Sequence, residues 1–286
     1  MSRRFFLRSA AGIGLGLSGT AGYAVGIEPT WEGVVKRPLP LRGLPDAWMG
    51  KRIAQVSDLH AGPRVSGSFL RRVFSELPEL QPDLVVVTGD WVTMHDRLPD
   101  QPLADALTAL TAATIDRGVP VLACLGNHDF GSAWTNTRLA DQLATHLTDR
   151  GIDLLRNHSM TIDGLTFAGV DDLWSPAFVP EEVVDSLPSD RDAIVLCHNP
   201  DGMDTQAFVE GRWSGVMLSG HTHGGQCRLP LLGRPLLPIR NARYAAGWVD
   251  VSNTRKLYVN VGLGHSHRVR FGVRPEVTVF TLKRST

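Results

Sequence analysis

Two histidines separated by one residue, in the sequence GHTHGG at positions 220–225, are the first residues that could carry out chemistry. Glycine costs conformational entropy and is retained where a backbone bends sharply or lies close to another group. Side chains at i and i+2 of an extended segment point to the same side. We therefore predict that His221 and His223 face a common site and that the flanking glycines bend the chain around it.

Polar residues of the kinds that bind divalent metals also follow four other short apolar runs. A single histidine beside an apolar run is usually a buried core residue, but five of the ten histidines of this chain recur in this way. Their donor atoms are oxygen and imidazole nitrogen, which suit Mn, Fe or Zn better than a thiolate site would. The full set is Asp58, His60, Asp90, Asn127, His128, His198, His221 and His223.

The elements that must position these residues alternate between short apolar runs and stretches of helical spacing. The five runs are 52–60, 83–90, 119–129, 193–200 and 215–225, and the helical patterns are 66–80, 102–118 and 137–151. This alternation predicts an α/β fold, with the site at the carboxyl ends of the strands. Three further strand-like runs, 164–172, 256–264 and 276–283, have no helices between them. They favour a four-layer α-β-β-α sandwich of two mixed sheets flanked by helices over one doubly wound sheet.

The five polar blocks, in order, resemble the calcineurin-like metallophosphoesterase superfamily. Its pattern is D-x-H, G-D, G-N-H-[DE], H and G-H-x-H, and this chain has SDLH, TGDW, LGNHDF, CHNP and SGHTHGG. The resemblance extends over residues 52–283. The flanking segments GHTHGGQ, HNPD and RVRFGVRPEV resemble the bacterial branch whose members are often exported or linked to membranes.

The resemblance implies a site for two divalent metal ions. Asp58, His60 and His223 would hold one ion, and a second set would hold the other: Asn127, His198 and His221. Asp90 would bridge the two ions. Four positive charges from two ions exceed the two negative charges of the aspartates, so the site is expected to attract a hydroxide and an anionic phosphate.

The reaction that the resemblance implies is hydrolysis of a phosphoester, most simply a phosphodiester, by attack of a metal-bridging hydroxide on phosphorus. Some relatives of this branch hydrolyse the pyrophosphate of UDP-diacylglucosamine, so a pyrophosphatase for a lipid-linked substrate is the alternative. A non-catalytic metal-binding scaffold is a remote third. The serine/threonine phosphatase branch is disfavoured because it carries GDxxDRG where this chain reads GDWVTM. The purple acid phosphatase branch is disfavoured because this chain has Thr93 where that branch has a metal-binding tyrosine.

Several residues near the motifs leave alternatives open. By resemblance, His128 would protonate the leaving oxygen as a general acid. Asp129 would either orient His128 or only cap the loop. Arg64 and Arg270 could contact phosphate or be structural. Four aromatic residues could line an apolar groove or pack the loops: Trp91, Phe130, Trp134 and Trp174.

The amino-acid composition limits the classes of binding partner that are expected. Basic and acidic residues both number 29, so the net charge is zero and nothing in it favours nucleic acid. No feature indicates a protein partner beyond an export system. The three cysteines are too few for a disulfide framework, and Cys124 and Cys197 are expected to be small buried residues.

The first 26 residues are predicted to be a targeting segment and not part of the fold. Ser2-Arg3-Arg4-Phe5-Phe6-Leu7-Arg8 resembles a twin-arginine export signal, followed by an apolar stretch and small residues. The alternative is an N-terminal membrane anchor, because residues 9–26 approach the ~17 residues of a minimal span. We therefore expect recognition by the twin-arginine machinery and a location outside the cytoplasmic membrane. A lead-in edge strand and linker over 27–50 and a catalytic domain over 51–286 would follow.

Overall fold

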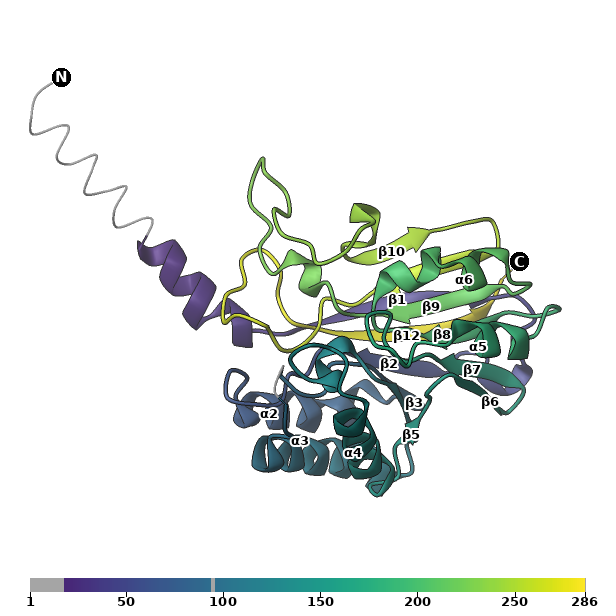
Figure 1. Cartoon of the computed structure of the whole chain (residues 1–286), viewed down its shortest axis with the longest axis horizontal. Coiled ribbons are helices and arrows are strands. Elements are labelled where there is room, and N and C mark those ends of the chain that lie inside the picture. The colour runs from purple at the N-terminus through teal and green to yellow at the C-terminus, as the bar shows by residue number, and fades with distance from the viewer. Residues whose placement is uncertain (1–17, 94–95, 286) are drawn as a thin grey trace, which may run out of the picture.

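The fold is described from a computed structural model, which covers residues 18–93 and 96–285. Two six-stranded mixed sheets lie face to face, and helices cover their outer faces (Figure 1). The predicted four-layer α-β-β-α sandwich is thereby confirmed.

The first sheet carries the strands that lead to the first three polar blocks. Neighbours β2 to β5 are parallel, whereas β12 is antiparallel to β2 and parallel to β1 at the edge. In spatial order the strands are β1 (Gly33–Leu41), β12 (Glu276–Arg284), β2 (Arg52–Val56), β3 (Leu84–Thr88), β4 (Val121–Cys124) and β5 (Asp153–Leu154). The carboxyl ends of β2, β3 and β4 therefore meet at one edge of the sheet.

The second sheet carries the other two blocks. Its four central strands are parallel and its two edge strands, β10 and β6, are antiparallel to their neighbours. In spatial order the strands are β10 (Gly247–Asp250), β11 (Arg255–Val259), β9 (Gly215–Ser219), β8 (Ala193–Leu196), β7 (Leu165–Gly169) and β6 (His158–Ile162). Because β8 and β9 are neighbours, the residues that follow them are brought together.

The helices bury their apolar faces against the sheets. In α2 (Gly67–Glu76) the buried residues Phe69, Leu70, Val73 and Phe74 form one stripe at helical spacing. With α3 (Asp100–Ala113) and α4 (Thr137–Thr148) it covers the first sheet, while α5 (Pro180–Ser186) and α6 (Gln206–Glu210) cover the second. Short 3-10 helices are η1 (Glu28–Thr30), η2 (Asp46–Trp48), η3 (Leu77–Leu80), η4 (Ile115–Arg117), η5 (Asn127–Phe130), η6 (Pro200–Asp204), η7 (His223–Gly225) and η8 (Ala242–Tyr244).

Alternation along the buried strands builds two separate core layers. In β3, Val85 and Val87 pack with the helices, whereas Leu84 and Val86 face the other sheet. The side-chain period of a strand is two, so one continuous apolar run serves both faces. This packing fixes the two sheets relative to each other and so positions the loops at their shared edge.

The described chain begins with a helix over residues 18–26 that stands out from the body (Figure 1). Its end is held by a hydrogen bond from the Arg270 amide to the Ala24 carbonyl (2.9 Å) and by an edge contact between the rings of Tyr23 and Phe271. Among the described residues, no helix has the length and apolar character needed to cross a bilayer. The twin-arginine motif lies outside the described residues.

Candidate metal centre

Each predicted metal-binding residue lies just after a strand. Asp58 and His60 follow β2, and Asp90 follows β3. The others follow the remaining strands: Asn127 and His128 follow β4, His198 follows β8, and His221 and His223 follow β9. These segments meet because the carboxyl ends of the parallel strands of both sheets adjoin. The seven predicted ligands are all buried, with exposed fractions of 0 to 4%.

One half of the centre joins the first motif to the last. Ligand atoms of Asp58, His60, Asp90 and His223 all lie within 4.8 Å of one another. Nε2 of His60 is 3.1 Å from Nε2 of His223 and 3.6 Å from an Asp90 oxygen. Nε2 of His223 is 3.4 Å from Oδ1 of Asp58. Two imidazole nitrogens and two carboxylates that converge in this way could hold a divalent cation.

The other half of the centre also adjoins Asp90. Nε2 of His198 is 3.2 Å from Oδ2 of Asp90, and Nδ1 of His221 is 3.0 Å from Oδ1 of Asn127. The rings of His198 and His221 have centroids 5.1 Å apart and cross at 80°. Asp90 Oδ2 is thus approached by histidines from both halves of the centre.

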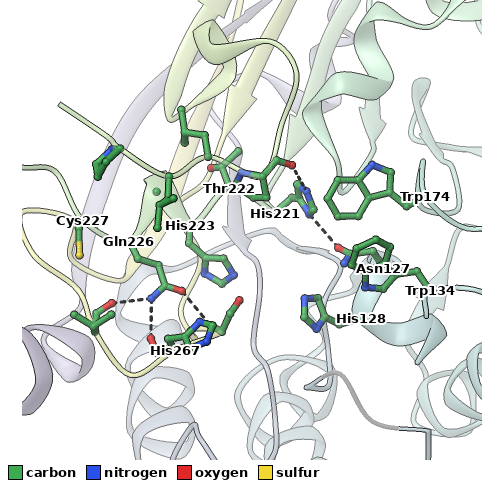
Figure 2. A pocket seen from close by; sticks show the side chains of 17 residues that line it. Asn127, His128, Trp134, Trp174, His221, Thr222, His223, Gln226, Cys227 and His267 are labelled. Carbon is green, nitrogen blue, oxygen red and sulfur yellow. Dashed lines mark hydrogen bonds between the residues drawn. The ribbon is translucent and has the colours of Figure 1, made fainter. Parts of the chain in front are cut away.

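Hydrogen bonds at the far nitrogens of two rings fix which nitrogen faces the centre. Nδ1 of His198 lies 2.7 Å from the Thr88 carbonyl. Nε2 of His221 lies 3.0 Å from the Pro238 carbonyl (Figure 2). A carbonyl only accepts, so each of these nitrogens carries the proton and the other nitrogen faces inward. Nε2 of His198 is buried and lies 3.2 Å from Oδ2 of Asp90, but the geometry of this contact does not make it a hydrogen bond. Such an atom fits a metal ligand, and the donor set fits Mn, Fe or Zn.

The backbone at the centre is held in an unusual conformation. Asp58, His60, Asp90, His221 and His223 all have positive φ, between 47° and 70°. Non-glycine residues rarely adopt this left-handed region, and clusters of them mark functional sites. The strain is thus concentrated on residues that supply donor atoms.

Glycines leave room for the donor atoms. A Cβ on Gly220 would lie 1.9 Å from Oγ of Ser57 and 2.4 Å from Oδ2 of Asp58. A Cβ on Gly126 would lie 2.3 Å from Oδ1 of Asp90. These contacts are far closer than atoms tolerate. The glycine beside the histidines is required because the carboxylate of another strand end occupies that space.

Burial keeps three histidines neutral. It lowers the pKa of His60 to about 3 and that of His221 to about 3, with the neighbouring histidines adding to the shift. Burial, with the nearby charge of Arg270, also lowers the pKa of His223 well below its usual value. A neutral imidazole is the form that binds metal.

The pKa values of the two carboxylates and of His198 depend on their mutual charges as well as on burial. Burial raises the pKa of Asp58 to about 6, although the positive charge of His198 opposes the shift. Burial would raise the pKa of Asp90 too, but the neighbouring histidines, His198 foremost, hold it well below its usual value. Burial alone would lower the pKa of His198, yet the charge of Asp90 raises it well above the usual value. A cation bound here would have to displace the His198 proton.

His128 lies at the edge of the centre. Its Nε2 is 3.9 Å from Oδ2 of Asp90, its side chain is 13% exposed, and it lines the neighbouring cavity (Figure 2). Its amide donates to Oδ1 of Asp90 (3.0 Å), which ties the loop to the carboxylate. The ring therefore reaches both the centre and the space in which a substrate would lie.

Asp129 does not orient His128 in this structure. Its two carboxylate oxygens accept the amides of Gly126 (2.8 Å) and Val92 (3.2 Å), and burial raises its pKa well above the usual value. The Nδ1 atom of His128 is buried without a hydrogen-bond partner. Of the two roles expected for Asp129, the geometry matches the loop cap, because both oxygens are occupied by backbone amides.

A cavity of about 730 Å³ opens beside the metal centre (Figure 2). Asn127, His128, His221 and His223 form part of its wall, and Leu236, Leu237 and Val269 form an apolar part. Trp134 packs on Trp174 with ring centroids 4.6 Å apart. The rings of Trp174 and His221 are nearly perpendicular (83°), with centroids 4.5 Å apart. The donor atoms thus adjoin a space suited to an apolar group.

The four aromatic residues divide between the two expected roles. Trp134 and Trp174 line the cavity. Trp91 and Phe130 are fully buried in the core, where the Trp91 indole donates to the Cys124 carbonyl (3.2 Å). The loop-packing role therefore holds for one pair and the groove-lining role for the other.

Both arginines singled out in the sequence bond to backbone. Arg270 is fully buried and donates to the carbonyls of Val261 (2.9 Å), Gly262 (3.0 Å) and Val273 (3.2 Å). Arg64 donates to the Ser266 carbonyl. Both belong to the support of the loops around the centre.

Sequence reasoning missed Asp172. Its Oδ1 accepts the Trp174 amide (2.8 Å), its Oδ2 is buried without a partner, and burial raises its pKa to about 7. It follows β7 in the segment GVDD, at the same edge of the sheet as the ligands. An acidic pair directly after a buried strand was the available signal. Cys124 and Cys197 are buried, as expected.

Comparisons with known proteins agree with this geometry. Residues 51–225 match the calcineurin-like phosphoesterase family. The chain is 31% identical to phosphodiesterase YaeI of Escherichia coli, with 99% of each chain covered, and 32% identical to the uncharacterized metallophosphoesterase YkuE of Bacillus subtilis, with 99% of this chain and 98% of YkuE covered. It is 28% identical to the UDP-2,3-diacylglucosamine pyrophosphatase LpxG of Chlamydia trachomatis, over 80% of this chain and 82% of LpxG. The chain therefore belongs to the calcineurin-like phosphoesterase family.

Proposed function

We propose that this protein is a phosphodiesterase that depends on two divalent metal ions. The observation that carries the proposal is the position of Asp90, whose Oδ2 lies 3.6 Å from a nitrogen of His60 on one side and 3.2 Å from a nitrogen of His198 on the other. A carboxylate that lies close to donor atoms of both sets is the arrangement that two neighbouring cations require.

Each half of the centre would hold one ion. One set is Asp58, His60 and His223, the other is Asn127, His198 and His221, and Asp90 would contribute to both. Ions bound there would polarise the phosphoryl group and lower the pKa of a water molecule, which supplies a nucleophile at neutral pH. Nitrogen and oxygen donors favour Mn, Fe or Zn.

His128 would serve the leaving group. It lies on the cavity wall within 3.9 Å of Asp90, and its ring is partly open to the cavity. A protonated Nε2 at this position would donate its proton to the departing oxygen, as a general acid does. Asp129 would act only through the backbone, by holding the loop on which His128 lies.

The apolar cavity wall favours substrates with an apolar group beside the phosphoester. Trp134, Trp174 and the leucines of residues 236–237 offer no charge to bind a sugar phosphate or nucleotide at that side. LpxG is named for a lipid-bearing pyrophosphate substrate. A pyrophosphatase for a lipid-linked substrate is therefore the second candidate function.

We also propose export by the twin-arginine route, because Arg3 and Arg4 stand in the expected context. That route carries folded proteins, and a centre assembled from five strand ends requires the folded chain. Replacing both arginines by lysine should leave active protein in the cytoplasm. Equal cytoplasmic amounts of the native and double-lysine forms would contradict export.

The proposed activity is tested with bis(p-nitrophenyl) phosphate and a lipid pyrophosphate as parallel substrates. Metal analysis should find two ions per chain, chelation should abolish hydrolysis, and Mn²⁺ should restore it. Faster turnover of the pyrophosphate would favour the second candidate. Metal binding without hydrolysis of either substrate would indicate a scaffold, and full activity without metal would overturn the proposal.

A further inference from the structure

Beside the cavity, one loop exposes large apolar side chains to solvent. We call residues 228–240 the rim loop. Within it, Leu231 is fully exposed, Leu236 is 77% exposed and Leu232 is 74% exposed. These are the three most exposed large apolar residues in the described part of the chain. Single exposed leucines are common, but three in six residues form a feature that requires an explanation.

The tip of the rim loop is a defined hairpin. Leu229 and Gly233 exchange backbone hydrogen bonds in both directions (2.7 and 2.9 Å). Leu231 lies at the tip with φ of 65°, a conformation that is unfavourable for a branched side chain. The hairpin thus holds an apolar residue outward at a cost in backbone energy, and the loop projects from the body between β9 and β10 (Figure 1).

The rim loop is tied to the metal centre at two points. The Arg234 guanidinium donates to the carbonyl of Gly224, which follows His223. The Pro238 carbonyl accepts from Nε2 of His221 (3.0 Å). Leu236 is both exposed and part of the cavity wall. A surface on which the tip rests would therefore lie directly at the mouth of the cavity.

Within the segment that carries the tip, the charged side chains are all basic, and the carboxylates of Asp201 and Asp204 contact only its base at residues 240–244. The sequence contains no aspartate or glutamate between Glu210 and Asp250, whereas Arg228, Arg240 and Arg243 are exposed there. Exposed leucines flanked by arginines match the interface of an anionic bilayer, in which leucine is buried among acyl chains and arginine meets phosphate groups.

The N-terminal helix ends close to the rim loop. Tyr23, near the end of that helix, and Arg234 line the same surface pocket. The apolar N-terminal segment therefore joins the body beside the rim loop. If that segment lies in or at a membrane, the tip is held near the same surface.

We propose that the rim loop inserts Leu231 and Leu232 into the surface of an anionic lipid bilayer and sets the cavity mouth against it. A second copy of the chain is the alternative occupant, but a specific protein interface buries about 800 Å² on each partner, more than a three-residue tip provides. The membrane contact goes beyond the proposed function, because it requires no hydrolysis.

The test places a fluorescent label at the tip. In the full chain with Cys227→Ser, the remaining cysteines are buried, so Leu232→Cys can be labelled selectively. The matched control is Val209→Cys on α6, an apolar residue that is 56% exposed and lies on the other side of the molecule (Figure 1). Vesicles of phosphatidylcholine with or without phosphatidylglycerol, with and without lipids that carry a quencher in the acyl chain, are added to each.

The label at position 232 should brighten with vesicles that contain phosphatidylglycerol and be quenched by the acyl-chain quencher, whereas the label at 209 should not. Leu231→Ser should weaken the vesicle affinity reported at position 232 by about tenfold. Adding Asp90→Asn should leave the signal intact, which separates membrane contact from catalysis. No response at 232, equal responses at both positions, or a dimer in sedimentation that Leu231→Ser dissolves would overturn the proposal.

Discussion

The metal centre and the rim loop are neighbours, yet they are built in opposite ways. The seven predicted ligands are buried, five of them lie on backbone with positive φ, and they are packed so tightly that Gly220 leaves no room for a Cβ. The rim loop exposes three leucines and contacts the body at few points. The comparison indicates that the chemistry depends on the packed strand ends, while the choice of substrate surface depends on side chains that the core does not restrain.

The largest effect is expected from Asp90→Asn. The change removes the charge that both halves of the centre share, so metal content should fall in both and hydrolysis should drop to the uncatalysed background. Metal analysis and turnover of bis(p-nitrophenyl) phosphate measure this. Asp250→Asn, which alters an exposed carboxylate, is the matched control and should change neither. A fully active Asp90→Asn protein would remove the basis of the proposed centre.

His128→Asn should reduce turnover by about 100- to 10,000-fold, the range typical of general acid–base catalysis. Metal content should stay unchanged, because His128 is not assigned as a ligand. The loss should be smaller for p-nitrophenyl esters, whose leaving group needs no proton, than for alkyl esters. Equal losses for both kinds of ester would assign His128 a positioning role instead.

Metal affinity should fall as the pH is lowered, in two regimes. Above pH 6, Asp58 is largely ionised and His198, whose pKa is raised by the charge of Asp90, is the ligand whose proton a metal ion must displace, so affinity should fall by no more than about tenfold per pH unit as the pH is lowered. Below about pH 6 Asp58 is protonated as well, and the slope should approach about a hundredfold per unit. His60 and His221, with pKa values near 3, add nothing in this range. Metal titrations between pH 5 and 8 measure the slope, and Asp58→Asn should remove the steeper part.

The smallest effect is expected on the apolar wall. Trp134→Ala should lower kcat/KM for a phosphodiester with an acyl tail by about tenfold, since a large apolar contact is lost. A small ester such as bis(p-nitrophenyl) phosphate should be affected about twofold or less. Trp31→Ala, which removes a half-exposed tryptophan elsewhere, is the control. If both esters lose activity equally, the wall does not select substrates.

Local patterns in the sequence were sufficient to predict the layered α/β fold and the positions of the donor residues along the chain. Alternating apolar runs and helical stripes are local patterns. Two sheets between layers of helices are an arrangement that buries the apolar faces of all these elements. The placement of donors such as Asp58 and His198 just after buried strands is also local. Their convergence follows once the parallel strands are aligned.

The roles of the side chains that neighbour the donor residues could not be predicted in this way, because they depend on tertiary contacts. The carboxylate of Asp129 accepts hydrogen bonds from the amides of Val92 and Gly126. The guanidinium of Arg270 donates to backbone carbonyls, so neither side chain faces the cavity. Trp134 lines the cavity while Trp91 lies in the core, although both follow closely on the motif segments. The hydrogen bond from the Val92 amide to Asp129 joins residues 37 positions apart, so no local pattern predicts it. The contacts of Arg270 are closer in sequence, but they form only because the loop over residues 261–273 folds back on itself. The anchoring of the rim loop by Pro238 and His221 is of the same kind, because it joins a loop to a strand end through tertiary packing.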